Sequence, residues 1–296
     1  MSTMRLAHAV VDRLYPHAPG LVVRWLRGHS HYYQDAVYVV SFPKCGRTWL
    51  RLLLGKALAL EHKVEASFED TLCLTPVAER IPTLPDVRVL HYDQPQMKRA
   101  EELTRDCRAL KHKKIVLLVR DVRDVLVSMY FQYSRRPNSR PVIPREYLSD
   151  ITTYVHSPVG SLDTFLKYYA IWADNRDVPA EFVLVRYEDL HRNPQDELRR
   201  ILSVIQDREF SDEILAEAVQ FASFNNMRRL ESSGSTERPM FKPGNVDDPD
   251  SYKTRRGKVA GFGEYLSADD VEYISRRAAA ELPALYGYRF PLEHAV

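Results

Sequence analysis

Four short apolar runs, each followed closely or after a loop by a segment with helical spacing, constrain the fold of this chain more than any other feature. The runs span 36–40, 86–90, 115–119 and 182–185, and three of them are rich in β-branched residues, which favours buried strands. Strands that alternate with helices are typical of a parallel sheet covered on both faces. We therefore expect one α/β domain over 1–296, with a central parallel β-sheet flanked by helices.

Six segments have apolar residues at the three- and four-residue spacing that predicts helices. In the clearest of them, leucines and alanines form one stripe. The six segments are Trp49–Leu60, Val122–Tyr133, Leu162–Asn175, Asp196–Ile205, Ser211–Phe221 and Ala268–Leu282.

Composition excludes several classes of protein. The chain has 42 Lys and Arg residues against 40 Asp and Glu, a balance that indicates neither disorder nor a nucleic-acid partner. Cys45, Cys73 and Cys107 form no Cys-x-x-Cys pair, so we expect reduced thiols, no metal site and a cytoplasmic location. No apolar run reaches the roughly 18 residues of a transmembrane segment. The lead-in at 1–34 lacks the pattern of a signal peptide, and its arginines leave membrane-surface contact open beside a plain lead-in.

Two stretches interrupt the alternation of strands and helices. The first, at 134–148, is rich in proline and arginine, and the second, at 232–257, runs from an acidic stretch at 247–250 to a basic one at 253–258. Loops of this length within a compact domain are typically functional lids or disordered segments. We expect both to be lid loops. The first either selects the molecule on which the protein acts, which would be anionic or a carbohydrate, or is a solvated flap.

A candidate anion-binding loop follows the first strand. The segment 41–50, Ser-Phe-Pro-Lys-Cys-Gly-Arg-Thr-Trp-Leu, leads from that strand into a helix, where unpaired N–H groups and the positive helix end attract anions. Lys44 adds a charge and Thr48 a hydroxyl group. An ordinary turn with a solvated lysine is the alternative. The loop is not a Walker A motif, because its lysine precedes its glycine.

Two further strands end in candidate ligand-binding residues. Arg120 follows the third strand, at the carboxyl edge where open α/β sheets bind ligands, and Ser128 lies eight residues later. Both could hold one phosphate, although Arg120 could equally belong to a surface network with neighbouring aspartates. Tyr187 follows the fourth strand in Arg-Tyr-Glu-Asp-Leu and could be a core residue.

Five motifs together resemble those of the sulfotransferases that use 3′-phosphoadenosine 5′-phosphosulfate (PAPS). The segment 43–49 resembles their PKxGTTW loop, and 119–128 resembles their arginine at a strand end with a serine eight residues later. The segments 187–189, 223–227 and 255–262 resemble their YED, TSFxxM and RKGxxGxW elements. The motifs occur in the order of the family and span most of the chain. The resemblance implies the sulfotransferase fold, which is related to that of P-loop nucleotide kinases.

The resemblance also implies a role for each matching residue. Lys44, Gly46, Arg47 and Thr48, within a loop that includes Cys45, would bind the 5′-phosphate. Trp49 and Phe224 would flank the adenine and Tyr187 would bind it, with Ser223 in the same element. The 3′-phosphate would be held by Arg120, Ser128, Arg255, Arg256 and Gly257. PAPS would then be the co-substrate and adenosine 3′,5′-bisphosphate (PAP) the product. The net charge of +2 would conceal a local cationic site, with the acidic residues elsewhere, as at 247–250.

The sequence departs from the family pattern at several positions. Cys45 stands where serine is common, Arg47 where threonine is common, and Ala222 replaces the threonine of TSF, which weakens one expected adenine contact. Ala260 and Phe262 replace the glycine and tryptophan of the last element. The KxxxTVxxxE dimer motif of the family is absent, so the oligomeric state stays open.

His91 is the candidate general base. Transfer of a sulfuryl group needs a proton acceptor, and histidine titrates near working pH. His91 follows the second strand and resembles the strand-end histidine that serves as the base in the family, with Lys44 as the second catalytic residue. His112, which precedes a strand, and Glu65 and Glu69 are weaker candidates. The transferred group is monoanionic, so no metal is required.

Three functions remain under consideration. The first is a PAPS-dependent sulfotransferase that acts by in-line displacement on a hydroxyl or amine of a small molecule, with a carbohydrate or glycolipid acceptor as the alternative. The second is a nucleotide kinase-like phosphoryl transferase, which the missing Gly-Lys-Ser/Thr triplet disfavours. The third is a non-catalytic nucleotide-binding protein. The sequence leaves the acceptor undetermined.

Overall fold

The computed structural model describes residues 36–136, 143–234, 238 and 241–290, and the structural statements below refer to them. The expected lead-in at 1–34 lies outside this part of the chain, as do 137–142 of the first candidate lid loop and part of the second.

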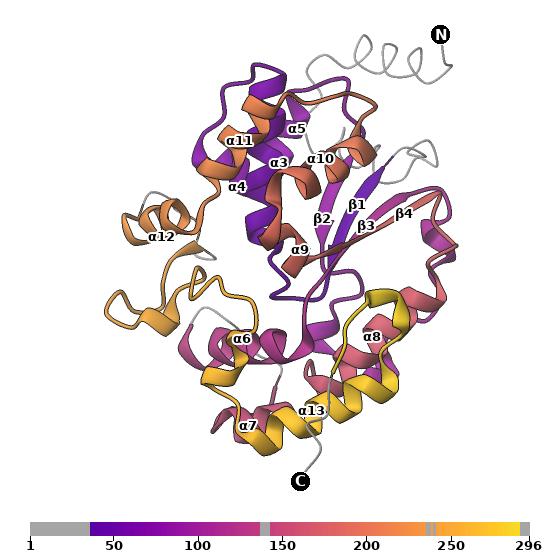
Figure 1. Cartoon of the computed structure of the whole chain (residues 1–296), viewed down its shortest axis with the longest axis vertical. Helices are drawn as coiled ribbons and strands as arrows, with labels where there is room; N and C mark the ends of the chain where they lie inside the picture. The colour runs from indigo at the N-terminus through magenta and orange to yellow at the C-terminus, as the bar shows by residue number, and fades with distance from the viewer. Residues whose placement is uncertain (1–35, 137–142, 235–237, 239–240, 291–296) are drawn as a thin grey trace, which may run out of the picture.

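A four-stranded parallel sheet forms the centre of the domain (Figure 1). Its strands are β1 (Val37–Ser41), β2 (Val87–Leu90), β3 (Lys114–Val119) and β4 (Glu181–Arg186), in the order β2-β1-β3-β4. Each lies within one residue of a run expected from the sequence. The parallel α/β fold is therefore confirmed.

Helices cover the sheet on two sides (Figure 1), with α3, α4, α10 and α11 on one side and α6, α8 and α13 on the other. The helices are α3 (Arg47–Glu61), α4 (Phe68–Cys73), α5 (Thr75–Glu79), α6 (Val122–Arg135), α7 (Ile151–Val155), α8 (Leu162–Asp174), α9 (Tyr187–Arg192), α10 (Pro194–Ile205), α11 (Asp212–Phe221), α12 (Phe224–Ser232) and α13 (Ala268–Glu281). Short 3₁₀ turns include η1 (Pro95–Met97), η4 (Arg145–Leu148), η6 (Pro249–Ser251) and η7 (Gly261–Glu264).

The six helices expected from periodicity are present, with ends shifted by at most two residues. The sequence analysis missed α4, α5, α7, α9 and α12, which are too short to show an apolar stripe over several turns. Local signals stabilise some of them. Ser67, for example, caps α4 by accepting from the N–H of Asp70, whose carboxylate accepts from the N–H of Ser67. This is a capping box, which satisfies N–H groups at the start of a helix.

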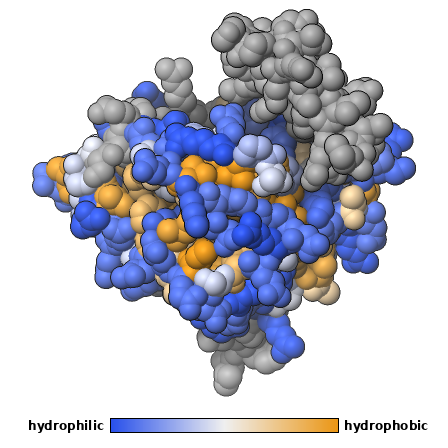
Figure 2. Space-filling model, turned by 90° about the horizontal axis from the view of Figure 1, so that it is seen from above, coloured by the Kyte–Doolittle hydropathy of each residue, from blue (hydrophilic) through white to orange (hydrophobic). Residues whose placement is uncertain are grey.

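The core lies between the sheet and the two helical layers. Strand β3 is buried from Ile115 to Val119, and five of the six leucines of α3, all but Leu60, are fully buried. The face shown in Figure 2 is mostly hydrophilic, with its apolar residues in separate groups. Among the described helices, none combines the length and the apolar composition needed to cross a lipid bilayer.

The strand order places a crevice between β1 and β3. The chain passes from β1 outward to β2 and then returns to the other side of β1 as β3. Ser41 at the end of β1 pairs with Leu118 near the end of β3, so the loops that follow these strands leave the sheet side by side. A reversal of this kind opens a ligand crevice at the carboxyl edge.

Candidate functional site

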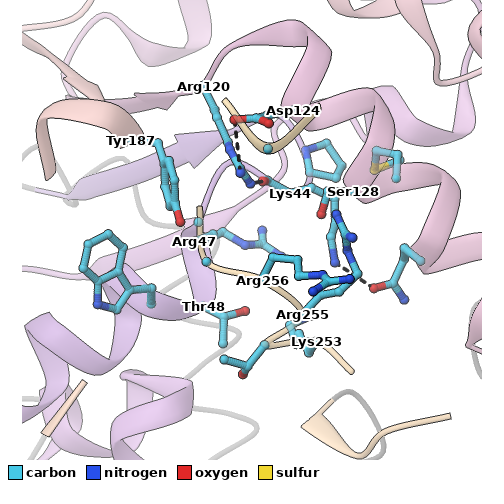
Figure 3. Close-up of a pocket in the computed structure, with 18 of the residues that line it drawn as sticks. Lys44, Arg47, Thr48, Arg120, Asp124, Ser128, Tyr187, Lys253, Arg255 and Arg256 are labelled. Atoms are coloured by element: carbon cyan, nitrogen blue, oxygen red, sulfur yellow. Dashed lines mark hydrogen bonds and ion pairs between the residues drawn. The ribbon is translucent and has the colours of Figure 1, made fainter. Parts of the chain in front are cut away.

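A cavity of about 800 Å³ opens at this edge of the sheet. Segments that follow β1, β2, β3 and β4 line it, together with 253–258 (Figure 3). Most of the residues singled out from the sequence lie in its lining: Lys44, Gly46, Arg47, Thr48, Trp49, His91, Arg120, Ser128, Tyr187, Phe224, Arg255, Arg256 and Gly257. The fold thus gathers residues from the whole length of the chain at one place.

Cys45 and Ser223, which the sequence also suggested, lie outside this lining. The thiol of Cys45 points into the core, where its Sγ lies 3.6 Å from the hydroxyl oxygen of Tyr169, and burial raises its pKa to about 12. Ser223 precedes α12 and lines a separate, shallow hollow with Lys56. The side chains of Cys45 and Ser223 therefore point away from the cavity.

The loop between β1 and α3 has the backbone of an anion-binding turn. Lys44 has φ +69° and Gly46 has φ +96°, the left-handed conformation that glycine adopts without strain. A Cβ atom on Gly46 would lie 2.6 Å from the ring of Tyr187, so only glycine fits this close approach. Helix α3 begins at Arg47, and its first N–H groups therefore open toward the cavity.

Two cations in this loop, Lys44 and Arg47, are partly buried and line the cavity. Burial, with the charges of Lys253, Arg136 and Arg255, holds the pKa of Lys44 well below its ordinary value. The Nζ atom of Lys44 donates to the side-chain oxygen of Gln132 at 3.0 Å. Burial also lowers the pKa of Arg47 to about 9, with a contribution from the neighbouring Arg51. Both cations would gain from an entering anion, because it replaces the lost solvation.

Arg120 connects three segments of the site. Its guanidinium donates to the carbonyl oxygen of Lys44 at 3.2 Å and to that of Lys258 at 2.9 Å. It lies 3.5 Å from the carboxylate of Asp124 and stacks over the ring of Tyr187 at 4.2 Å. Its Nε atom is buried and has no hydrogen-bond partner among the described residues. Arg120 is therefore fixed in position and still has a donor to offer.

Asp124 anchors the C-terminal part of the site to α6. Its carboxylate, 4% exposed, accepts from the N–H groups of Ala260 and Phe262, each at 3.0 Å. Burial raises its pKa, although Arg120 opposes the rise. The aspartate for which a surface network with Arg120 was the alternative therefore holds the segment that carries Arg255 against α6.

Arg255 and Arg256 approach the cavity from that segment. The guanidinium of Arg255 lies over the rings of Phe131 and Tyr265, at 4.4 and 4.7 Å from their centres, and 3.3 Å from the carboxylate of Asp250. Arg256 donates to the hydroxyl of Tyr265 at 3.0 Å. The expectation that the acidic stretch at 247–250 lies away from the cationic site was wrong for Asp250, because the chain turns back between η6 and Arg255.

Aromatic rings form one wall of the cavity. The ring of Trp49 lies edge-on to that of Tyr187 at 5.7 Å and close to that of His191 at 6.1 Å. His191 also hydrogen-bonds the carbonyl oxygen of Gly257 at 3.0 Å. Gly257 has φ +61°, and a Cβ atom on it would lie 2.5 Å from the ring of Phe224. Sequence reasoning missed His191, which lies four residues after Tyr187 and so on the same side of α9.

His91 lines the cavity, and one hydrogen bond determines which of its ring nitrogens carries the hydrogen. Its Nδ1 atom lies 2.9 Å from the carbonyl oxygen of Ser41, which can only accept, so Nδ1 carries the hydrogen and Nε2 has a free lone pair. Burial, reinforced by Arg47, holds the pKa of His91 well below its ordinary value. His91 is therefore neutral at working pH, as a proton acceptor must be. The weaker candidates Glu65, Glu69 and His112 lie outside the lining.

Lys253 is the main functional candidate that the sequence analysis missed. It lines the cavity, and burial with the charges of Arg136 and Arg47 lowers its pKa to about 7. Its place two residues before Arg255 was a signal that sequence reasoning could have used. Arg136 and Gln132, on and just after α6, also line the cavity. In the described part of the chain, no group of three His, Cys, Asp or Glu residues has a metal-binding arrangement.

Comparison with known proteins agrees with these features. The sulfotransferase domain family model matches residues 34–284. Cytosolic sulfotransferase 17 of Arabidopsis thaliana is 26% identical over 257 residues, which cover 80% of this chain and 71% of that protein. Flavonol 4′-sulfotransferase of Flaveria chlorifolia is 24% identical over 274 residues, which cover 84% and 80%.

Solved structures show the same fold at lower identity. The crystal structure of mouse sulfotransferase SULT7A1 complexed with PAP has a TM-score of 0.55 at 17% identity and covers 84% of both chains. Retinol dehydratase in complex with androsterone and PAP has a TM-score of 0.53 at 15% identity and covers 88% of this chain and 83% of its own. With the family model matched over most of its length and this fold at its centre, the chain belongs to the sulfotransferase domain family.

Proposed function

We propose that this protein transfers a sulfuryl group from PAPS to a hydroxyl or amine group of a small-molecule acceptor. One observation carries the proposal: a neutral His91 with a free Nε2 atom shares a cavity with the partly buried Lys44 of an anion-binding loop. Such a pair supplies what sulfuryl transfer needs, a proton acceptor on one side and positive charge at the leaving oxygen on the other.

The shape of the site supports PAPS as the co-substrate. Gly46 and Gly257 let the rings of Tyr187 and Phe224 pack directly against the backbone of the two phosphate-binding segments, an approach that any Cβ atom would prevent. Arg120 has a buried donor without a partner among the described residues. Lys44, Arg47 and Thr48 would hold the 5′-phosphosulfate. Arg120, Ser128, Arg255, Arg256 and Gly257 would hold the 3′-phosphate.

The adenine would lie against the aromatic wall. Trp49 and Phe224 would flank it, and Tyr187 would contribute a hydrogen bond. The ring of Phe224 is 40% exposed and is free to close on a ligand. Stacking of this kind favours a planar base without demanding one particular base.

Each step of the reaction can be attributed to particular residues of the chain. Nε2 of His91 accepts the proton of the acceptor hydroxyl while Ser41 holds the imidazole ring through Nδ1. Lys44 and the N–H groups at the start of α3 stabilise the charge that develops on the phosphate oxygen as the sulfuryl group departs. The displacement is in line and forms no covalent bond to the protein, because donor and acceptor are held in one cavity and can react with each other directly.

The relatives support a small acceptor and a cytoplasmic location. One of them is named for a flavonol acceptor and others are named cytosolic. The apolar part of the lining near His91, which includes Met97 and Met129, suits the skeleton of a small organic acceptor. An acceptor of carbohydrate or glycolipid type is the alternative within the same reaction.

Ligand binding tests the proposal directly. PAP at saturating concentration should raise the melting temperature of the purified protein, whereas ATP with Mg²⁺ should raise it much less. Incubation with labelled PAPS and a panel of hydroxylated acceptors should then yield labelled product. Stabilisation by ATP with Mg²⁺ and none by PAP would contradict the proposal and favour a phosphoryl transferase.

A further inference from the structure

The charges around the cavity do not balance among the described residues. Nine Lys and Arg side chains line it, against the two carboxylates of Asp124 and Glu264. Two more carboxylates, of Glu231 and Asp250, contact lining arginines from behind. The site therefore carries an excess of positive charge that its own acids leave uncompensated.

The cations fall into two groups when each is matched with a carboxylate. Five lie within 4 Å of one: Arg120, Arg136, Arg255, Arg256 and Lys258. The ninth, Arg238, takes part in other interactions, and Lys44, Arg47 and Lys253 have no carboxylate within 4 Å among the residues with described positions. Lys44 and Arg47 belong to the loop that would bind the phosphosulfate, so the cofactor would neutralise them. Lys253 is then the cation left over.

Lys253 is held firmly through its backbone. Its N–H group donates to one carboxylate oxygen of Glu231 at 2.6 Å, and that of Thr254 donates to the other at 2.8 Å. Glu231 is 1% exposed and also pairs with Arg136 at 3.4 Å. The carboxylate thus fixes the position of Lys253 while its charge is shared with a second cation.

The side chain of Lys253 lines the same cavity as Lys44 and His91. Its charge also contributes to the lowered pKa of both. In Figure 3, Lys253 lies toward one end of the labelled cluster, beyond Arg255, and Arg120 with Asp124 lies toward the other. Lys253 therefore shares the cavity with the base and lies away from Arg120.

We infer that Lys253 is a specificity-determining residue that binds an anionic group on the acceptor, so that the protein sulfonates hydroxylated molecules that already carry a carboxylate, phosphate or sulfate group. This inference rests on the proposed function. A partly buried ammonium without a counterion loses part of its solvation, and an anion beside it forms a charge-assisted hydrogen bond. The nearby Met97, Met129 and Tyr133 would pack against the rest of such an amphipathic acceptor.

Matched ligands on the PAP-loaded protein test the inference. The probes are 4-hydroxyphenylacetate and 4-hydroxyphenyl phosphate, each measured by calorimetry against neutral 4-hydroxyphenylacetamide, with 4-hydroxybutyrate and its amide as an aliphatic pair. We expect at least one anion to bind about tenfold or more tightly than its amide, the effect of one hydrogen bond between charged groups. Comparison of the carboxylate with the phosphate identifies the preferred anion. Absence of any preference for an anion overturns the inference.

Variants of Lys253 separate this role from cofactor binding. Lys253→Met should abolish the preference for the anion and leave PAP affinity unchanged, which also shows that the variant folds. Lys253→Arg should retain the preference, and Lys111→Met, which removes an exposed lysine outside the cavity, should behave as the wild type. If Lys253→Met weakens binding of PAPS but not of PAP and keeps the preference, Lys253 binds the sulfuryl group and the inference fails. If the wild type does not bind PAP at all, it is the proposed function that fails.

Discussion

Gly257 offers a sharp test of how the aromatic wall binds the adenine. Replacement by alanine has two effects that the structure separates. The backbone at φ +61° disfavours a residue with a Cβ atom by about 1–2 kcal/mol. The new Cβ would also lie 2.5 Å from Phe224, so the ring must move by about 1 Å to reach normal contact.

Only the second effect should change ligand affinity, because the backbone strain is the same in the free and the bound protein. Stacking of a base on an aromatic ring contributes about 1–3 kcal/mol, so displacement of Phe224 should weaken PAP binding by about 5- to 150-fold. Isothermal titration calorimetry with PAP measures this change, and thermal denaturation measures the strain.

Gly234 provides the matched control. It has φ +66°, and no atom of the described residues lies within 4 Å of a Cβ atom placed on it. Gly234→Ala should therefore lower the melting temperature by a similar few degrees and leave PAP affinity as it was. Equal PAP affinities for Gly257→Ala and Gly234→Ala would refute the role assigned to Phe224.

Four further outcomes are expected. His91→Ala should reduce turnover of labelled PAPS by about 10²- to 10⁴-fold with PAP affinity nearly intact, and an equal loss of both would remove His91 from the role of base. Arg120→Met should weaken PAP binding by about tenfold or more, and Lys44→Ala should do the same; unchanged calorimetric affinities would contradict their phosphate contacts. Because anions raise a lowered amine pKa, PAP binding near pH 8 should take up protons at Lys44, whose pKa is lowered by burial and by the charges of Lys253, Arg136 and Arg255. The binding enthalpy should then vary with the ionisation enthalpy of the buffer, and a constant value would show that this amine is already charged. In the ligand-free protein, the lowered pKa of His91 should make stability fall as pH drops below about 6.5, since the unfolded chain then binds the extra proton. The denaturation midpoint of the wild type should therefore fall more between pH 7 and pH 5.5 than that of His91→Gln. Equal changes in the two proteins would argue against this role of His91.

The sheet and its larger helices followed from the sequence because each has a pattern that depends on its own residues. The apolar runs of β1 and β3 and the stripe of α3 report burial directly. The short helix α9 could not be predicted in this way, since it begins at the carboxyl end of β4 and is stabilised by packing that only the folded chain supplies. Its histidine, His191, was missed for the same reason.

The candidate site was predictable where a side chain lies beside a strand end. Lys44, His91 and Arg120 all follow strands, so the topology alone brings them together. Cys45 shows the limit of this reasoning: whether a loop residue faces the ligand or the core depends on two φ angles that its sequence does not specify. The position of Lys253 depends on a contact with Glu231 across 22 residues of chain, so its place two residues before Arg255 was only a weak signal.

The buried carboxylate of Glu231 has a consequence for how this enzyme family can diverge. The chain leaves Glu231 and returns to it at Lys253 and Thr254, while Arg136, where the other candidate lid loop begins, is held by the same group. Both loops are thus anchored by the carboxylate of Glu231. Doubling the length of a flexible loop costs only about 0.6 kcal/mol of closure free energy. Insertions or deletions in either loop can reshape the entrance for new acceptors while Arg255 and Arg256, beyond this anchor, keep their places.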